Sequence, residues 1–288
     1  MKVGYTSMNT PEDVRPDVLA RALEERGFDS LFIGEHSHIP ASRMTPYPAG
    51  GEMPKQYTRM MDPFVSLTVA ATATESLKLG LGVALPLEHD LMDLAKSAST
   101  LDVLSGGRLL FGVGVGWNVE ELANHRPIPW RMRYRALEDC VSALRSLWQD
   151  ENSEHHGEFY DFDAVWSFPK PAQQPSVPVL MGAGGKLGTQ HAVRWADEWM
   201  PIDISLGFTP ERVEYVVGKF RAAATEAGRG EIPVTMIVFG DPTFDLLKRY
   251  KELGIQRVVL GSGRAKWDEP DTTLAFLDHY SPMISDLA

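Results

Sequence analysis

The sequence predicts an α/β fold, a single (β/α)8 barrel (TIM barrel) in which residues 1–288 form one domain. Strand-like and helix-like segments alternate along the whole chain, which is the pattern of a parallel sheet. There are eight such units, and a chain of 288 residues suits a closed barrel, which typically needs about 250 residues. An open doubly wound sheet is disfavoured, because no Gly-x-Gly-x-x-Gly follows the first strand.

Short apolar runs predict the strands, and apolar residues at three- and four-residue steps predict the helices. The clearest helix covers residues 131–148, where Tyr134, Leu137, Val141, Leu144 and Trp148 share one face. The predicted strands are residues 2–8, 29–34, 77–85, 108–115, 177–181, 198–202, 232–239 and 255–260. The remaining predicted helices are residues 11–26, 63–74, 91–104, 186–196, 209–227, 242–253 and 272–283.

Two segments are too long to be simple connections, since loops of this length are usually functional. Residues 36–62 follow the second strand, so they lie on the C-terminal face of the barrel, where barrel active sites form. We expect this loop to be a lid. Residues 150–178 precede the fifth strand and enter the barrel from the opposite face, and we predict no function for them.

Composition and charge exclude several classes of protein. The net charge of −11 disfavours nucleic acid and anionic membranes as partners, because phosphates bind basic surfaces. The single cysteine, Cys140, cannot form an intramolecular disulfide, and no secretory or membrane-spanning segment is recognisable, so we expect a cytoplasmic protein. No histidine or cysteine spacing predicts a metal site.

Candidate functional residues lie where predicted strands end. Glu35 and His36 end the second strand and are suited to proton transfer near neutral pH, or alternatively close the strand as a hydrogen-bonded pair. The third strand carries glycines at 80 and 82, which indicate a bulge or tight packing. The fourth has glycines at 112, 114 and 116, which either leave space for a flat ligand or relieve crowding inside the barrel.

The fifth strand runs into a glycine-rich turn that opens a helix: Gly182, Ala183, Gly184, Gly185 and Lys186. Free backbone N–H groups and the helix dipole point the same way at such a position, so the turn predicts an anion site. Several amide hydrogen bonds to one phosphate, at roughly 1.5–3 kcal/mol each, are enough to hold a cofactor. The alternative is a structural turn that binds nothing.

Five segments resemble the luciferase-like monooxygenase superfamily, in family order and across almost the whole chain. The closest resemblance is to its deazaflavin (coenzyme F420)-dependent oxidoreductases. The segments are Leu-Phe-Ile-Gly-Glu-His at 31–36, Leu-Asp-Val-Leu-Ser-Gly-Gly-Arg-Leu-Leu-Phe-Gly-Val-Gly-Val-Gly-Trp at 101–117, Arg-Tyr-Arg-Ala-Leu-Glu at 133–138, Pro-Val-Leu-Met-Gly-Ala-Gly-Gly at 178–185 and Ala-Asp-Glu-Trp-Met-Pro at 196–201.

The resemblance implies roles for these residues. A non-prolyl cis peptide between Gly82 and Val83, followed by Ala84, forms a bulge against the cofactor ring. His36 lies near the redox carbon and Glu35 orients it. The remaining implied contacts come from Val115, Gly116 and Trp117, which line the ring, and from residues 182–186, which bind the cofactor phosphate.

Two departures separate the chain from the sugar-phosphate dehydrogenases of that family. Those enzymes carry an acidic residue at the position of Trp117 and a tryptophan at that of Pro40. An apolar Trp117 suits a less polar substrate. Lys55, Arg59 and Lys186 are candidates for binding the anionic oligoglutamate tail of F420.

The sequence therefore predicts an oxidoreductase that transfers a hydride between F420 and a small organic molecule. One alternative is an FMN-dependent monooxygenase that uses O2 on the same scaffold, which needs a flavin reductase as partner. Another is a flavin-binding protein without catalytic activity. A homodimer is one alternative for the oligomeric state, with Phe64, Val65 and Leu91 as candidate interface residues.

Overall fold

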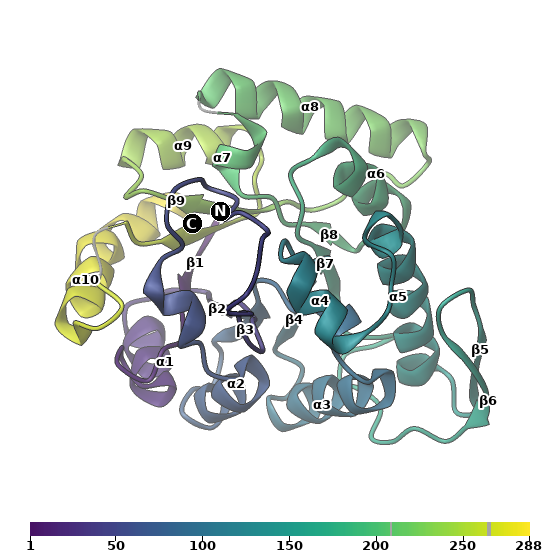
Figure 1. The fold of residues 1–288 in the computed structure, drawn as a ribbon. Helices are drawn as coiled ribbons and strands as arrows, with labels where there is room; N and C mark the ends of the chain where they lie inside the picture. The colour runs from purple at the N-terminus through teal and green to yellow at the C-terminus, as the bar shows by residue number, and fades with distance from the viewer. Residues whose placement is uncertain (208, 264–265) are drawn as a thin grey trace.

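The eight predicted strand–helix units are present and close into a barrel (Figure 1). The structure, a computed structural model, describes residues 1–207, 209–263 and 266–288. The barrel strands are β1 (Lys2–Ser7), β2 (Ser30–Ile33), β3 (Lys78–Leu81), β4 (Leu109–Val113), β7 (Val179–Met181), β8 (Glu198–Trp199), β9 (Thr235–Phe239) and β10 (Arg257–Gly261). They pair in the order β8-β7-β4-β3-β2-β1-β10-β9, every pair parallel.

The barrel closes between β8 and β9 through a reduced set of contacts. Trp199 pairs with Val234 and Ile202 with Ile237, both in parallel register. The predicted strand at residues 198–202 is thus shorter than expected, because only its first two residues form a continuous strand. The predicted third strand also ends early, at Leu81, where the chain bulges before Ala84 pairs with Val113.

Helices surround the strands, and most agree with the prediction to within a few residues. The ring consists of α1 (Pro16–Glu25), α2 (Pro63–Thr72), α3 (Leu91–Leu104), α5 (Arg133–Gln149), α6 (Lys186–Trp195), α8 (Pro210–Glu226), α9 (Phe244–Glu252) and α10 (Pro270–Leu287). Side chains cap several of them, such as Asp90, which accepts hydrogen bonds from the Met92 and Asp93 amides at the start of α3. Phe64 and Leu91, two of the candidate interface residues, are buried within the chain, whereas Val65 is exposed.

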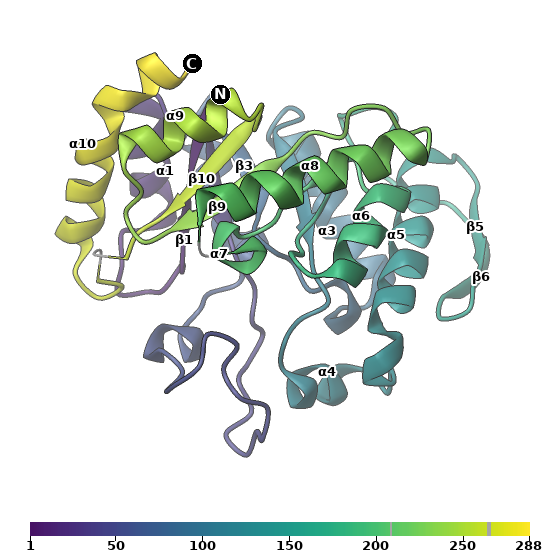
Figure 2. The same ribbon diagram turned by 90° about the horizontal axis from the view of Figure 1, so that it is seen from above.

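Several elements were not predicted. These are the short helices α4 (Val119–His125) and α7 (Asp203–Leu206), the 3-10 turns η1 (Lys55–Thr58), η2 (Pro86–Glu88) and η3 (Trp130–Met132), and a β-hairpin of β5 (Ser153–His156) and β6 (Asp161–Val165). The hairpin lies outside α5, away from the strands (Figure 1). The 36–62 loop and α4 project from the same side of the barrel (Figure 2).

The barrel interior is filled by side chains from alternate positions of the strands. Phe32, Leu110, Leu180, Met200, Ile237 and Val259 form a separate apolar cluster, and Val83 and Ile202 pack against it. A larger cluster lies between the strands and the helices. This arrangement is the usual packed core of a barrel rather than a pore, so any ligand site must lie above it.

Gly80 makes room for one member of the interior cluster. A Cβ at this position would lie 2.3 Å from the Phe32 ring, and Phe32 is fully buried. The glycine in β3, which the sequence left open between a bulge and tight packing, is therefore a packing residue.

We predict that Gly80→Ala lowers the free energy of unfolding by about 1–3 kcal/mol, because the ring must move within a filled interior. Thermal or urea unfolding measures the change. Gly218→Ala in α8 is the matched control, since a Cβ there meets nothing within 4 Å. It is expected to stabilise the protein by roughly 0.5–1 kcal/mol. Equal stability of Gly80→Ala and wild type would contradict the packing role.

Candidate functional site

A cavity of about 460 Å³ opens at the C-terminal ends of the barrel strands. This volume falls in the range of small-molecule sites, roughly 300–1,000 Å³. Ten of the predicted site residues line it, namely Glu35, His36, Gly82, Val83, Val115, Gly116, Trp117, Gly182, Ala183 and Gly184. The other three do not: Ala84 is fully buried, Gly185 is the N-cap of α6, and Lys186 lines a neighbouring hollow.

The floor of the cavity is Val83, which follows a cis peptide bond from Gly82, as the family resemblance implied. The Val83 side chain lies against Gly114 and Gly182, where a Cβ would approach its methyl groups to 2.7 and 2.3 Å. Gly112 serves a different purpose, because a Cβ there would lie 1.9 Å from the Leu81 carbonyl oxygen. Gly112 in β4 and Gly114 just beyond it therefore relieve crowding, whereas Gly116 has room for a Cβ but a left-handed backbone with φ of 69°. Of the three, Gly114 and Gly116 face the cavity.

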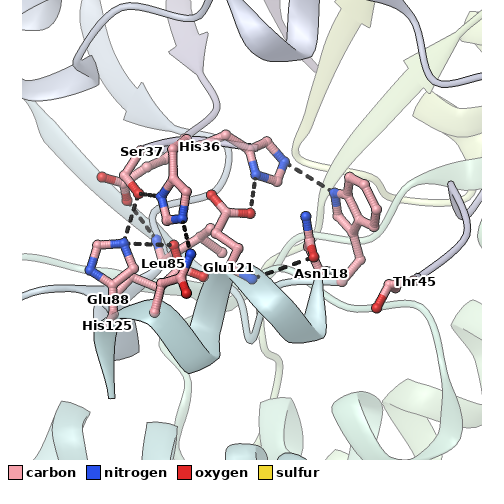
Figure 3. Close-up of polar contacts among 12 residues, drawn as sticks. His36, Ser37, Thr45, Leu85, Glu88, Asn118, Glu121 and His125 are labelled. Carbon is pink, nitrogen blue, oxygen red and sulfur yellow. Dashed lines mark hydrogen bonds and ion pairs between the residues drawn. The ribbon is translucent and has the colours of Figure 1, made fainter. Parts of the chain in front are cut away.

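His36 is held through both ring nitrogens (Figure 3). The Trp117 indole N–H donates to His36 Nε2 at 3.0 Å, and His36 Nδ1 lies 2.7 Å from Glu121 Oε2. An indole nitrogen can only donate, so Nε2 is the acceptor and the ring proton is on Nδ1, directed at the Glu121 carboxylate. His36 is thus a neutral imidazole whose basic nitrogen lies on the Trp117 side, and both residues line the cavity.

The expectation that Glu35 orients His36 was wrong, because Glu121 does so. The Glu35 carboxylate accepts the Leu85 backbone N–H at 2.7 Å and lies 2.7 Å from His89 Nε2. Burial lowers the pKa of His89, but the hydrogen bond and charge of Glu35 outweigh this and raise it. Glu35 therefore fixes the chain just after the Val83 bulge. Residues 35 and 36 thus have their partners in different segments, Glu35 in residues 85–89 and His36 in Trp117 and Glu121.

The loop predicted as a lid covers the cavity with aromatic side chains. Tyr57 from η1 and Tyr47 pack edge-on against the Trp117 ring, with centroids 6.3 and 5.9 Å away. Tyr57 also lies 5.5 Å from the His36 ring. Burial raises the pKa of Tyr57 well above its usual value, so it stays a neutral phenol.

Glu120, next to the His36 partner on α4, anchors the same loop. Its carboxylate accepts the Met44 and Thr45 backbone N–H groups and the Thr45 hydroxyl. These hydrogen bonds lower the pKa of Glu120 to about 2. One short helix thus positions both the His36 imidazole and the lid.

The glycine turn at residues 182–185 lies where the cavity meets the start of α6. Gly184 lines both the cavity and a second hollow of about 330 Å³ that contains Lys186, Arg212 and Lys219. Within the described chain, Gly185 caps α6 without a side-chain hydrogen bond, so the first backbone N–H groups of the helix are available to an anion. Arg59 is a weaker candidate than predicted, because Glu12 pairs with its charge.

Five residues around the site were not predicted from the sequence: Glu121, Glu120, Glu88, Tyr47 and Tyr57. Residues 118–121 contain one signal that points to α4, since Asn118 accepts the Glu121 N–H in a typical N-cap arrangement. No local signal places this helix against residue 36. Neither a helix long and apolar enough to cross a membrane nor a metal-binding cluster of His, Cys, Asp and Glu occurs among the residues that the structure describes.

Fold and site together define a (β/α)8-barrel protein with a ligand-sized cavity and a held histidine at the C-terminal face. The chain belongs to the luciferase-like monooxygenase family, whose model matches residues 10–245. The members of this family are oxidoreductases and monooxygenases.

Three known proteins illustrate the similarity. An uncharacterized protein of Mycobacterium tuberculosis is 38% identical over 270 residues, 91% of this chain and 92% of that protein. An F420-dependent glucose-6-phosphate dehydrogenase of Intrasporangium calvum is 29% identical over 181 residues, 60% of this chain and 49% of the relative. The solved structure of an F420-dependent secondary alcohol dehydrogenase, bound to an F420-acetone adduct, superposes with a TM-score of 0.75 at 20% identity, covering 100% and 99% of the two chains.

We predict that Glu120→Ala loosens the lid, so that amides near residues 44–45 exchange hydrogen faster than in wild type. Hydrogen-exchange mass spectrometry of the 36–62 segment measures this, with Glu226→Ala on the exposed face of α8 as the control. In wild type the contribution of Glu120 to the stability of the lid should be present above about pH 4.5 and lost as pH falls toward 2, because folding lowers the pKa of Glu120. Unchanged exchange in Glu120→Ala would show that other contacts hold the lid.

Proposed function

We propose that this protein is an oxidoreductase that transfers a hydride between coenzyme F420 and an organic substrate with a hydroxyl or carbonyl at the reacting carbon. The observation that carries the proposal is His36, a neutral imidazole at the cavity wall, backed by a buried carboxylate. The F420-dependent enzymes among the similar proteins support the choice of cofactor. An FMN-dependent monooxygenase is the rival that the experiments must separate.

The residues around the cavity fit a deazaflavin. The ring would lie on the floor made by Val83, beside Gly114 and Gly116, and the phosphate would bind the N–H groups of the 182–185 turn at the start of α6. Lys186, Arg212 and Lys219 offer positive charge where the cavity meets the second hollow. A bound deazaflavin supplies the acceptor or donor of the hydride, and the protein supplies position and proton transfer.

His36 handles the proton that accompanies the hydride. Oxidation of an alcohol releases the hydroxyl proton, and Nε2 of His36 accepts it while the Glu121 carboxylate stabilises the imidazolium. Reduction of a ketone runs the same transfer in reverse. Because the Trp117 N–H occupies Nε2 in the structure, we infer that a substrate hydroxyl inserts between them, donating to His36 and accepting from Trp117.

The cavity wall favours an uncharged substrate. Its described lining residues include no lysine or arginine, whereas Asp13 and Glu35 are present. A phosphorylated sugar needs cationic partners for its phosphate. The aromatic rings of Trp117 and Tyr57 instead suit an apolar group.

The first measurement is a fluorescence titration of the purified protein with oxidised F420 and, in parallel, with FMN. We expect F420 to bind more tightly, and Lys186→Ala to weaken F420 binding by no more than about fivefold, because an exposed charge contributes up to roughly 1 kcal/mol. Tighter binding of FMN would make the monooxygenase the better account. Binding of neither would leave the glycine turn a structural feature.

We predict that His36→Asn lowers kcat by roughly 10²–10⁴-fold, the usual contribution of a general base, while the Kd for F420 changes little. Stopped-flow reduction of F420 by a panel of secondary alcohols measures kcat, with glucose 6-phosphate as a comparison substrate. Asp139→Asn is the matched control, since it removes a carboxylate from His155, a histidine outside the cavity. Full turnover in His36→Asn would remove the proposed role, and good turnover of glucose 6-phosphate would remove the proposed substrate class.

A further inference from the structure

The proposed reaction uses only one of three carboxyl groups that converge beside His36. Glu35, Glu88 and Glu121 come from the end of β2, from η2 and from α4, and all three are buried, with 7%, 9% and 1% of their surface exposed. Figure 3 shows Glu88 and Glu121 in one polar cluster with His36. Three neighbouring buried carboxylates would repel one another strongly unless each is either protonated or paired with a donor or a positive charge.

Two of the three groups have partners suited to a carboxylate. Glu35 accepts the Leu85 N–H and pairs with His89. Glu121 Oε2 accepts the Nδ1 proton of His36. Among the described residues, Glu121 Oε1 and Glu88 Oε2 are both buried without a conventional donor. Glu88 and Glu121 lie in the same cluster (Figure 3), and a proton on one of the two carboxyl groups would supply the donor that both of these buried oxygens lack, because two carboxyl groups can share a hydrogen bond only if one of them carries a proton.

The surroundings decide which group holds that proton. Burial, and then the charges of Glu121 and Glu35, raise the pKa of Glu88 to about 9. The other titratable groups facing Glu88 are His89 beside it on the chain and His125 at the end of α4, whose Nε2 lies 3.8 Å from Glu88 Oε2. Burial and the nearby His38 lower the pKa of His125, so it is neutral near pH 7 and does not form an ion pair with Glu88.

We propose that Glu88 is a positioning residue, a neutral acid whose O–H holds one oxygen of Glu121 so that the other stays on His36 Nδ1. Glu121 then keeps the imidazole in the tautomer with its basic Nε2 toward Trp117 and the cavity. The catalytic consequence rests on the proposed function, but the proton on Glu88 and the tautomer of His36 do not. Loss of the Glu88 proton removes the donor and places a second negative charge beside Glu121, which releases His36 from its position.

The first test needs neither cofactor nor substrate. In protein labelled with 15N-histidine, the wild-type His36 signal, assigned by its absence in His36→Asn, should show the Nδ1–H tautomer near pH 7. Glu88→Ala should show a mixture of tautomers, and Glu88→Gln, whose amide N–H can replace the acid O–H, should restore the wild-type signal. The same tautomer in Glu88→Ala as in wild type would overturn the proposal. Asp139→Asn should leave the His36 signal unchanged.

A second test does not depend on Glu88→Ala being folded. Because folding raises the pKa of Glu88, its contribution to stability is full below about pH 4.5 and is lost as pH rises through about 9. The Tm of wild type should therefore fall relative to that of Glu88→Gln between pH 6 and pH 9.5. Parallel Tm curves would show that Glu88 is not a buried neutral acid and would overturn the proposal.

The third test measures how Glu88, acting through Glu121, affects turnover. Glu88→Ala should lower kcat about tenfold or more at pH 7, part of the roughly 10²–10⁴-fold contribution of a general base, and Glu88→Gln should recover most of the loss. The wild-type pH profile of kcat should fall with an apparent pKa near 9, and this limb should be missing in Glu88→Gln. Persistence of the limb in Glu88→Gln would overturn the proposal. Absence of F420 turnover, with the expected histidine spectra, would overturn only the proposed function.

Discussion

The side chain of Val83 occupies a space that only glycines leave free, and the position of the cavity depends on it. Below it lies the apolar cluster that fills the barrel, and on either side Gly114 and Gly182 bring two neighbouring strands close to its methyl groups. A methyl group added at either glycine would overlap Val83. The floor of the cavity is thus a packed part of the core, and because close-packed interiors resist deformation, it gives any ligand above it a fixed base.

A second constraint connects Glu35 and His36, at the side of the cavity, to the Val83 floor. Glu35 leaves β2 and accepts the Leu85 N–H just beyond the Val83 bulge, whereas the next residue, His36, turns to α4. That helix contributes Glu121 to His36 and Glu120 to the lid, so one short element links His36 to the loop that covers it. Movement of α4 would therefore alter lid and imidazole together. A substrate that separates Trp117 from His36 would act on the same element, since Trp117 directly precedes the N-cap of α4.

Under the proposed function, the cluster of acids beside His36 lets an acidic chain place a histidine as a base without a permanent positive charge. One carboxylate is paired with His89, one with His36, and the third is kept neutral by burial and by the other two. The charge in contact with the imidazole is then a single carboxylate, which is enough to stabilise an imidazolium and to fix its tautomer. Three positive side chains, Lys186, Arg212 and Lys219, line the hollow next to the glycine turn.

The sequence by itself determined the barrel, because alternating strand and helix periodicities need no tertiary information. Ten of the thirteen predicted site residues line the cavity. Glu35, His36 and the glycine turn were predicted because barrel sites form where strands end, whereas Val83, Val115 and Trp117 were predicted from the family resemblance. Only the tertiary structure decided the partners of those residues. Glu121 lies 85 positions from His36, and no local pattern encodes that contact. The interpretation of Glu35 as the orienting group failed because its carboxylate is bound to the Leu85 N–H and to His89. The neutral state that we propose for Glu88 depends on burial beside Glu35 and Glu121, which come from two other segments of the chain.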